Sequence, residues 1–407
     1  MNIELMLSRT MLIERLMGVF AYVLVALYGY SRLLHTENPK KLKGIFAVML
    51  TAIGVLAFFY VPGESADLCE WRKMYDSYWQ NRTFSEFVTG PLINSSTPVS
   101  YLMIYLCQKT GLDGVLPCVV ALIFFGSVFA IFKDCAARCK LQDDTPKVTY
   151  SLFKDNADVR SNSTYALALT FLCFMAAGEF LEVISGVRCL TALAIMAWCV
   201  YTDTVGDRTL LKNLVFYGIA CLMHLAAIPV FVLRLLYLLV GQFGNKKPKL
   251  GSYIVAIAIG AAGLVVGGSY LTAAFNKGIS YINNNWYSYS WEYIIGFMQL
   301  ALVLYTLLQY RKIKDEEGMQ GLKPLAQFNA FMCVPEILFC FEYTIFHRFI
   351  MFSSIIIAPL MYAVLQYKLQ KEDHRYVNFV RVLTLAILAV ACVRGNLCGY
   401  KFFLLDF

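Results

Sequence analysis

The stretch 112–133, LDGVLPCVVALIFFGSVFAIFK, is almost entirely apolar and is long enough to cross the hydrocarbon core of a bilayer as one helix. Similar runs follow one another along the chain, in which 59% of the residues are hydrophobic and only 15% are charged. Because lipid offers no hydrogen-bond partners to the backbone, such runs are expected to be helical. The sequence therefore predicts an all-α, polytopic integral membrane protein, with residues 1–407 forming a single transmembrane domain.

About twelve membrane-spanning helices are expected, a number compatible with a GT-C-like arrangement. The mean hydropathy of +0.60 agrees with this class of protein. No cleavable signal peptide is expected, because Arg9, Glu14 and Arg15 interrupt the first apolar run and no small-residue cleavage site follows it. The predicted spans are 11–31, 44–61, 112–133, 163–182, 186–203, 210–224, 225–240, 251–275, 291–310, 325–344, 346–367 and 378–396.

The basic residues predict the orientation of these spans. Clusters of Lys and Arg at 40–43, 246–249, 311–314 and 368–375 fall in loops on one side, which the positive-inside rule assigns to the cytoplasm. The net charge of +8 is thus a signal of topology. Since the basic residues are scattered over separate loops without interleaved aromatics, no nucleic-acid partner is predicted.

This orientation makes 134–162 a cytoplasmic loop and places the loops 62–97 and 276–290 on the outer, periplasmic side. In the first outer loop, Trp71, Tyr75 and Tyr78 share one helical face, which predicts a short amphipathic helix. The apolar segment that follows, 98–109, is too short for an ordinary span and is expected to lie on or dip into the outer leaflet.

The loop 276–290 gathers Tyr, Asn, Ser and Trp, including Trp286 and Tyr287. Aromatic rings stack on the apolar faces of sugars, and amides bond to sugar hydroxyls. The alternative is an interfacial aromatic belt, which Trp and Tyr supply in many membrane proteins, and for this loop alone that alternative is favoured.

Three basic side chains are predicted at helix ends on the outer side: Arg188, His224 and Arg348. An arginine binds phosphate or carboxylate through a planar fork of donors, and a histidine exchanges protons near neutrality. Asp67, Glu70 and Arg72 lie in the first outer loop. Together these groups suit the transfer of a group away from a phosphate-bearing lipid. The alternative for each arginine alone is interfacial anchoring, in which the side chain snorkels to the headgroups.

Other ionisable residues are assigned structural roles. Arg234 and Glu336 are charges within spans, so we expect Arg234 to snorkel or pair with Glu336, or Glu336 to bond to backbone freed at Pro335. The four histidines are dispersed and no metal-ligand spacing appears, so neither a metal nor another cofactor is expected. Cys135 and Cys139 are interpreted as unpaired thiols.

The order of the outer-side motifs resembles that of the EpsG/Wzy group of bacterial polysaccharide polymerases. The strongest element is a Gly-x-Arg span start followed later by His, although Cys189 stands where the family often has Gln. The resemblance extends over most of the chain and rests on Gly63, Asp67 and Tyr75, on Ser185-Gly186-Val187-Arg188, on Met223-His224 and on Arg348.

This resemblance implies a polymerase in the bacterial inner membrane that joins undecaprenyl-diphosphate-linked repeat units at the periplasmic face. Donor and acceptor are both lipid-linked, and membrane lipids and a chain-length regulator are further expected partners. Arg188 and Arg348 would hold the diphosphate, while His224 or a carboxylate, Asp67 or Glu70, would act as the base. Arg72, Tyr75, Trp286 and Tyr287 complete the expected substrate contacts.

The sequence leaves three alternative functions open. A lipid-linked oligosaccharide flippase would show internal repeats and charges spread through the bilayer depth, whereas the predicted polar cluster is one-sided. An O-antigen ligase would share the arginines and the histidine. A structural subunit without activity is the third reading.

Overall fold

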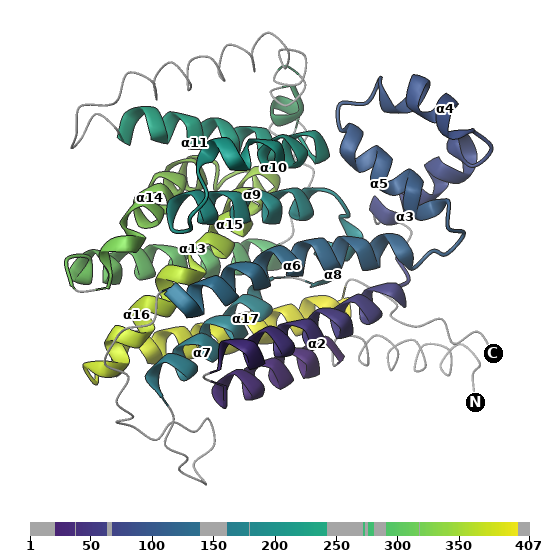
Figure 1. The fold of residues 1–407 in the computed structure, drawn as a ribbon. Helices are drawn as coiled ribbons and strands as arrows, with labels where there is room; N and C mark the ends of the chain where they lie inside the picture. The colour runs from purple at the N-terminus through teal and green to yellow at the C-terminus, as the bar shows by residue number, and fades with distance from the viewer. Residues whose placement is uncertain are drawn as a thin grey trace, which may run out of the picture.

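The computed structural model describes residues 21–36, 38–62, 67–138, 161–178, 180–241, 272, 276–280, 290–316 and 318–397. This part of the chain contains no β-strand and forms a bundle of helices from which one group projects to the side (Figure 1). The helix 21–34 is followed by α2 (Pro39–Phe58), α3 (Asp67–Met74), η1 (Tyr75–Trp79), α4 (Phe84–Phe87), η2 (Val88–Leu92), α5 (Pro98–Gln108), α6 (Val115–Arg138), α7 (Asn162–Ala177), α8 (Phe180–Ser185), α9 (Cys189–Thr204), α10 (Leu210–Met223), α11 (Ala227–Gly241), α13 (Ser290–Ile313), η3 (Gln320–Leu322), α14 (Lys323–Leu338), α15 (Tyr343–Ile356), α16 (Ala358–Gln370) and α17 (His374–Leu397).

The composition of these helices confirms the multi-pass membrane class. Four of the described helices, α2, α6, α13 and α17, are long and apolar enough to cross a membrane, and α15 with α16 makes a fifth if the bent pair is one span. Five shorter apolar helices accompany them: 21–34, α7, α9, α10 and Ala227–Leu238 of α11. The number of twelve spans stays a prediction, because the expected span 251–275 lies outside the described residues except for residue 272.

Two predicted spans are broken. The expected span 346–367 is two helices, α15 and α16, that meet at a bend of 48° near Ile357. Pro359 at the start of α16 causes the break, because its ring lacks an N–H and clashes with the carbonyl one turn earlier. The expected span 163–182 likewise ends at Gly178, and the short helix α8 follows.

Helices α2 and α6 pack against each other, and this packing determines where the segment between them begins and ends. The two helices are antiparallel: Phe46 stacks on Phe129 with ring centroids 5.0 Å apart, while the start of α6 meets the end of α2. A Cβ on Gly114 would lie 2.1 Å from the Phe58 carbonyl oxygen, so only glycine permits this approach. The segment between these helices, described at 59–62 and 67–114, therefore begins and ends at the same end of the bundle.

This segment, named the excursion (59–62 and 67–114), is the projecting group in Figure 1. Its buried aromatics include Trp71, Tyr75 and Trp79, whereas Tyr78 is 67% exposed. The predicted helix therefore exists, but its buried face includes Trp79 instead of Tyr78. The reason is that the chain continues as a π-helix, in which the Gln80 N–H donates to the Tyr75 carbonyl, and the wider turn brings Trp79 against Trp71 and Tyr101.

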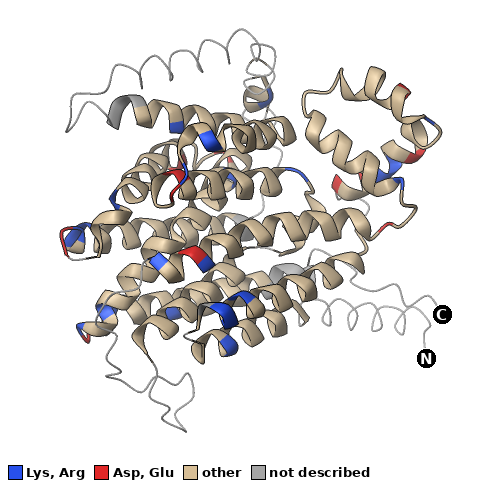
Figure 2. Ribbon diagram, viewed as in Figure 1, with Lys and Arg blue, Asp and Glu red and all other residues tan. Residues whose placement is uncertain are grey.

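The opposite end of the bundle carries ion pairs and many basic side chains. Figure 2 shows Lys and Arg near the turn from α13 to α14 and the turn from α16 to α17. Arg138 contacts both Asp134 (2.9 Å) and Asp207 (2.5 Å) there. The Lys368 ammonium lies 2.7 Å from Asp373.

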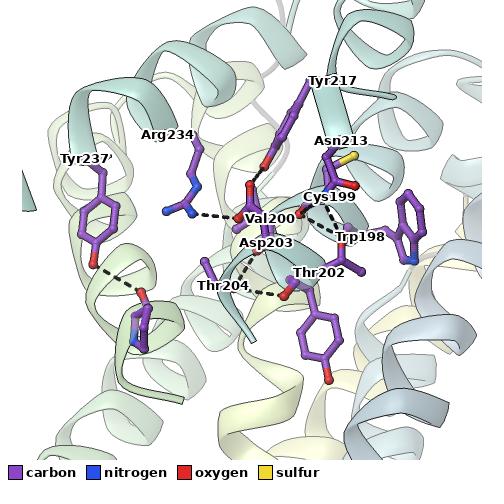
Figure 3. Close-up of polar contacts among 12 residues, drawn as sticks. Trp198, Cys199, Val200, Thr202, Asp203, Thr204, Asn213, Tyr217, Arg234 and Tyr237 are labelled. Atoms are coloured by element: carbon purple, nitrogen blue, oxygen red, sulfur yellow. Dashed lines mark hydrogen bonds and ion pairs between the residues drawn. The ribbon is translucent and has the colours of Figure 1, made fainter. Parts of the chain in front are cut away.

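Arg234 has a different partner from the one expected. Its guanidinium lies 2.7 Å from Asp203, which also accepts a hydrogen bond of 2.7 Å from Tyr217, and both charged side chains are almost fully buried (Figure 3). Arg234 therefore neither snorkels nor pairs with Glu336. Glu336 instead accepts a short hydrogen bond from Ser353 of α15. These contacts join α9, α10 and α11, and separately α14 and α15.

We predict that Asp203→Asn destabilises the protein strongly, because it leaves the Arg234 charge buried without its counter-ion, a change typically costing about 3–5 kcal/mol. The measurement is the thermal unfolding midpoint of the purified protein in detergent. Adding Arg234→Met should recover part of the loss. The control is Asp207→Asn, which removes an exposed partner of Arg138 and should cost less than about 1 kcal/mol. Equal losses in the two single variants would contradict the proposed role of the buried pair.

Candidate functional site

Arg188 lies where the excursion meets the bundle. It is the N-cap residue of α9, and its guanidinium stacks over the indole of Trp71 at 4.2 Å from the ring centroid. Its Nη1 also donates to the Thr97 hydroxyl over 3.5 Å. Trp71 is buried and packs edge-on against Tyr101. The excursion thus holds this arginine from one side while α9 holds it from the other.

The backbone before Arg188 is strained. Val187 has a φ of 48°, and the Arg188 N–H donates to the Gly186 carbonyl over 2.5 Å, which closes a γ-turn. A β-branched residue in the left-handed region costs about 1–3 kcal/mol and persists only where the surroundings enforce it. Such strain gathers at functional sites, and here it fixes the direction in which Arg188 leaves the bundle.

Arg348 belongs to the same end of the molecule. It lies in the second turn of α15, whose start is capped by Glu342 through hydrogen bonds from the N–H groups of Thr344 (3.3 Å) and Ile345 (2.6 Å). Arg348 is partly buried, and its charge acts electrostatically on Asp67, Cys189 and His224. The charge of Arg188 acts on the same three residues. The two arginines are therefore brought to one site from α9 and α15.

His224 lies in the turn between α10 and α11, outside both helices. Its Nδ1 accepts a hydrogen bond of 3.0 Å from the Ala226 N–H. In a neutral imidazole with Nδ1 as acceptor, the proton resides on Nε2. Desolvation, helped by the charges of Arg348 and Arg188, holds the pKa of His224 well below its usual range. At neutral pH the ring is therefore neutral and presents an N–H at Nε2.

The two carboxylates that were predicted from the sequence lie at the start of α3. Asp67 and Glu70 both lie in its first turn, with exposed side chains. Although Asp67 is exposed, neighbouring protein partly desolvates it and raises its pKa, an effect opposed by Arg188 and reinforced by Glu70. Asp67 therefore lies within reach of the arginine charges, and Glu70 adds negative charge beside it.

The remaining predicted substrate contacts are distributed differently. Arg72 turns toward the end of the excursion, where it donates to the Asp113 carbonyl over 2.8 Å and lies 3.7 Å from the Asp113 carboxylate. Tyr75 is buried against Tyr105 with ring centroids 6.2 Å apart. Both residues therefore have their partners within the excursion, away from Arg188 and Arg348. Trp286 and Tyr287 lie outside the described residues.

Two residues that the sequence analysis did not select stand beside the arginines. Glu182 of α8 has its Oε1 2.9 Å from the Nε2 of His347, and the Nδ1 of His347 lies 3.2 Å from the Tyr343 hydroxyl. The available signal was the position of His347 directly before Arg348 in a helix start. Glu182 gave no such signal, because its partner is distant in sequence. Among the described residues, no group of three or more His, Cys, Asp and Glu is arranged to hold a metal.

A model of the EpsG family matches residues 44–404, which is most of the chain and includes all the site residues described above. Comparison with curated proteins and with solved structures finds no match. The all-helical, multi-pass architecture and the cationic site at one end agree with the family assignment. The chain therefore belongs to the EpsG family of Wzy-like polysaccharide polymerases.

Proposed function

We propose that this protein is a glycosyltransferase that joins oligosaccharide repeat units carried on a lipid diphosphate, with undecaprenyl diphosphate as the carrier. The growing chain leaves its carrier and is transferred to a sugar hydroxyl of the next lipid-linked unit. The observation that carries this proposal is the convergence of Arg188, Arg348 and His224 at one end of an apolar bundle. The family assignment favours this activity over a flippase or a ligase.

The chemistry of the leaving group explains the two arginines. When the bond from the anomeric carbon to the diphosphate breaks, its electron pair stays on the phosphate oxygen, and negative charge develops there. Guanidinium forks stabilise such charge through paired N–H donors, most effectively where water is excluded. Arg188 and Arg348 come from different helices, so they can hold the diphosphate from two sides. The stack on Trp71 and the hydrogen bond to Thr97 hold Arg188 in place.

His224 suits a donor role at this site better than the base role that its residue type first suggested. Its Nδ1 is engaged by Ala226, and a neutral ring then offers only the Nε2 proton. A neutral imidazole donor stabilises developing negative charge, and the two neighbouring arginines disfavour its protonation. We therefore propose His224 as a third hydrogen-bond donor to the diphosphate, which leaves the base among the carboxylates at this end.

The proposed orientation places this site at the periplasmic face of the bacterial inner membrane. The distribution of basic side chains supports it, since clusters at the start of α2, at the end of α13 and around the turn from α16 to α17 all lie at the end away from the excursion (Figure 2). The substrates in this proposal are lipid-linked and arrive through the membrane plane.

We expect that a cysteine introduced at Glu86 on a cysteine-free background reacts with an impermeant maleimide in intact spheroplasts, and that one at Asp373 reacts only after lysis. Glu86 lies on the excursion and Asp373 at the opposite end. The reverse pattern would contradict the orientation.

We predict that Arg188→Lys and Arg348→Lys each shorten or abolish the polymer made in cells, at unchanged protein level, because an ammonium cannot form two parallel bonds to one phosphate. The readout is the length ladder of the polysaccharide on gels. The matched control is Arg208→Lys: Arg208 also stacks on a tryptophan, Trp198, at 4.7 Å, but lies in the turn beyond the opposite end of α9. A normal ladder in both site variants would leave these arginines as interfacial anchors.

The two roles considered for His224 predict different outcomes for His224→Gln. A glutamine Nε2 keeps a donor near the position of the imidazole Nε2 but cannot accept a proton as a base. We expect His224→Ala to slow polymerisation strongly and His224→Gln to retain much of the activity, measured as ladder length at matched expression. If glutamine is as damaging as alanine, the donor role is wrong and the base role is favoured.

A further inference from the structure

We infer that a turn of the excursion, residues 78–84, binds the growing polysaccharide and keeps it on the enzyme between transfers. Two exposed rings, Tyr78 and Phe84, stack on its sugars. The amides of Gln80 and Asn81, which lie between the rings in the sequence, bond to its hydroxyl groups. The inference rests on the proposed function, because the ligand is the polymer that the transfer step makes. The segment 78–84 is named the aromatic turn.

The two rings of the aromatic turn are exposed, whereas most other aromatic side chains of the excursion are buried. Tyr78 is 67% exposed and Phe84 is 55% exposed. Trp79, which follows Tyr78, is buried, and its ring lies 5.3 Å from that of Phe87. Phe84 contacts Tyr105 at 6.2 Å and leaves the rest of its surface open. The excursion therefore has an aromatic core of its own, and these two rings are available to a ligand.

Hydrogen bonds from side chains hold the backbone of the aromatic turn at three points. The Nε of Arg82 donates to the Tyr78 carbonyl over 2.8 Å. The Nζ of Lys109, at the end of α5, donates to the Gln80 carbonyl over 2.9 Å. The Tyr105 hydroxyl donates to the Arg82 carbonyl over 3.0 Å. Because the backbone is already fixed, a ligand that binds the side chains of this turn orders less of the chain, and binding loses less entropy.

The side chains between the two rings suit a carbohydrate. Gln80 and Asn81 are exposed, and within the described part of the chain no hydrogen bond engages either side-chain amide. An amide offers two N–H donors and a carbonyl acceptor, and a sugar hydroxyl both donates and accepts. An aromatic ring offers a flat apolar face that fits the C–H face of a sugar ring. Amides between two such rings therefore match a chain of hydroxylated rings.

The alternative for exposed rings in a membrane protein is contact with the bilayer interface. The aromatic turn is a poor match for hydrocarbon, because Arg82 lies within it and Asp76 and Glu86 flank it, all three exposed. The excursion has other exposed side chains that suit lipid better, among them Ile93 at 67% and Leu106 at 52%. The polar surroundings of its rings therefore favour a carbohydrate at the aromatic turn.

Contacts between aromatic rings connect this turn to the site of Arg188. The guanidinium of Arg188 stacks on Trp71, and the Trp71 ring lies 6.2 Å from the Trp79 ring. Beyond this pair, consecutive ring centroids lie 4.0–6.2 Å apart along the series Trp79, Phe87, Tyr105 and Phe84. Figure 1 shows α4, which begins at Phe84, at the far edge of the projecting group. A polymer that extends from the site along the excursion therefore reaches the aromatic turn at a distance from the reacting bond.

A contact remote from the reacting bond affects the length of the product. After each transfer the spent carrier leaves, and the lengthened chain has to return to the donor position. A second contact on the polymer makes this return an intramolecular step with a high effective concentration. Without that contact the chain dissociates more often between transfers, and the products are shorter. The aromatic turn takes no part in making or breaking bonds.

The first test measures binding of the polysaccharide itself. The polymer released by the wild-type strain is cut into water-soluble fragments and titrated calorimetrically into the purified full-length protein in nanodiscs. We expect Tyr78→Ala and Phe84→Ala each to raise Kd by about 10-fold, a loss typical of an aromatic anchor removed from an interface. Tyr78→Phe and Phe84→Tyr keep the rings and should bind nearly as well as the wild type.

The matched control for binding is Leu106→Ala, which removes an exposed apolar side chain from the same excursion and should leave Kd unchanged. The inference is wrong if the wild type does not bind the fragments, or if the two alanine variants at the rings bind them as well as the wild type. It is also wrong if Leu106→Ala weakens binding to the same extent, since general apolar contact then explains the loss.

The second test measures product length in proteoliposomes that contain lipid-linked repeat units extracted from a strain lacking this gene. We expect Tyr78→Ala/Phe84→Ala to shorten the product severalfold more than it slows the first transfer, whereas Arg188→Lys slows the first transfer itself. Products of wild-type length, or a first transfer slowed as much as the product is shortened, would overturn the inference. If the wild type forms no polymer, the proposed function is wrong, and the binding test still decides whether the turn binds polysaccharide.

Discussion

The stacking of the Arg188 guanidinium on the Trp71 indole connects the two parts of this molecule. One partner begins a helix of the bundle, and the other lies in the excursion between α2 and α6. A stack of this kind fixes the plane of the guanidinium and therefore the direction of its N–H groups. The strained turn at Val187 serves the same end, because it directs Arg188 toward the excursion. Together with the hydrogen bond to Thr97, this stack holds Arg188 where the excursion meets the bundle.

Arg234, an ionisable side chain away from the site, has a structural role in the same protein. Arg234 is buried, is paired at 2.7 Å with Asp203, and lies over Phe328 and Tyr237. Arg188 and Arg348 are instead only partly buried, and the charges of both act on Asp67 and His224. A buried charge with a dedicated counter-ion holds helices together, whereas two like charges at one partly exposed site suit an anionic ligand. This difference supports a ligand-binding role at the excursion end and a structural role for Arg234.

Features that depend on local composition could be predicted from the sequence. Apolar length and the membrane constraint predicted the helices, and the positions of Arg188 and His224 at helix ends followed from where the apolar runs stop. Features that depend on distant pairs were not predictable. Arg234 pairs with Asp203 across two helices, and Glu182 meets His347 from a helix 165 positions away in sequence numbering. The break at Ile357 was missed because hydropathy does not register the effect of Pro359 on the backbone. Tyr78 was placed on the wrong face because spacing rules assume 3.6 residues per turn, and the chain there is a π-helix.

The central claim is that Arg188 and Arg348 form one anion site at the end of the bundle that carries the excursion. A cryo-electron microscopy structure of the protein with undecaprenyl diphosphate tests it most directly. The account predicts density for the diphosphate between the two guanidiniums, with the Nε2 of His224 within hydrogen-bond distance of a phosphate oxygen. Diphosphate density elsewhere in the bundle, with the two arginines facing lipid headgroups instead, would contradict it.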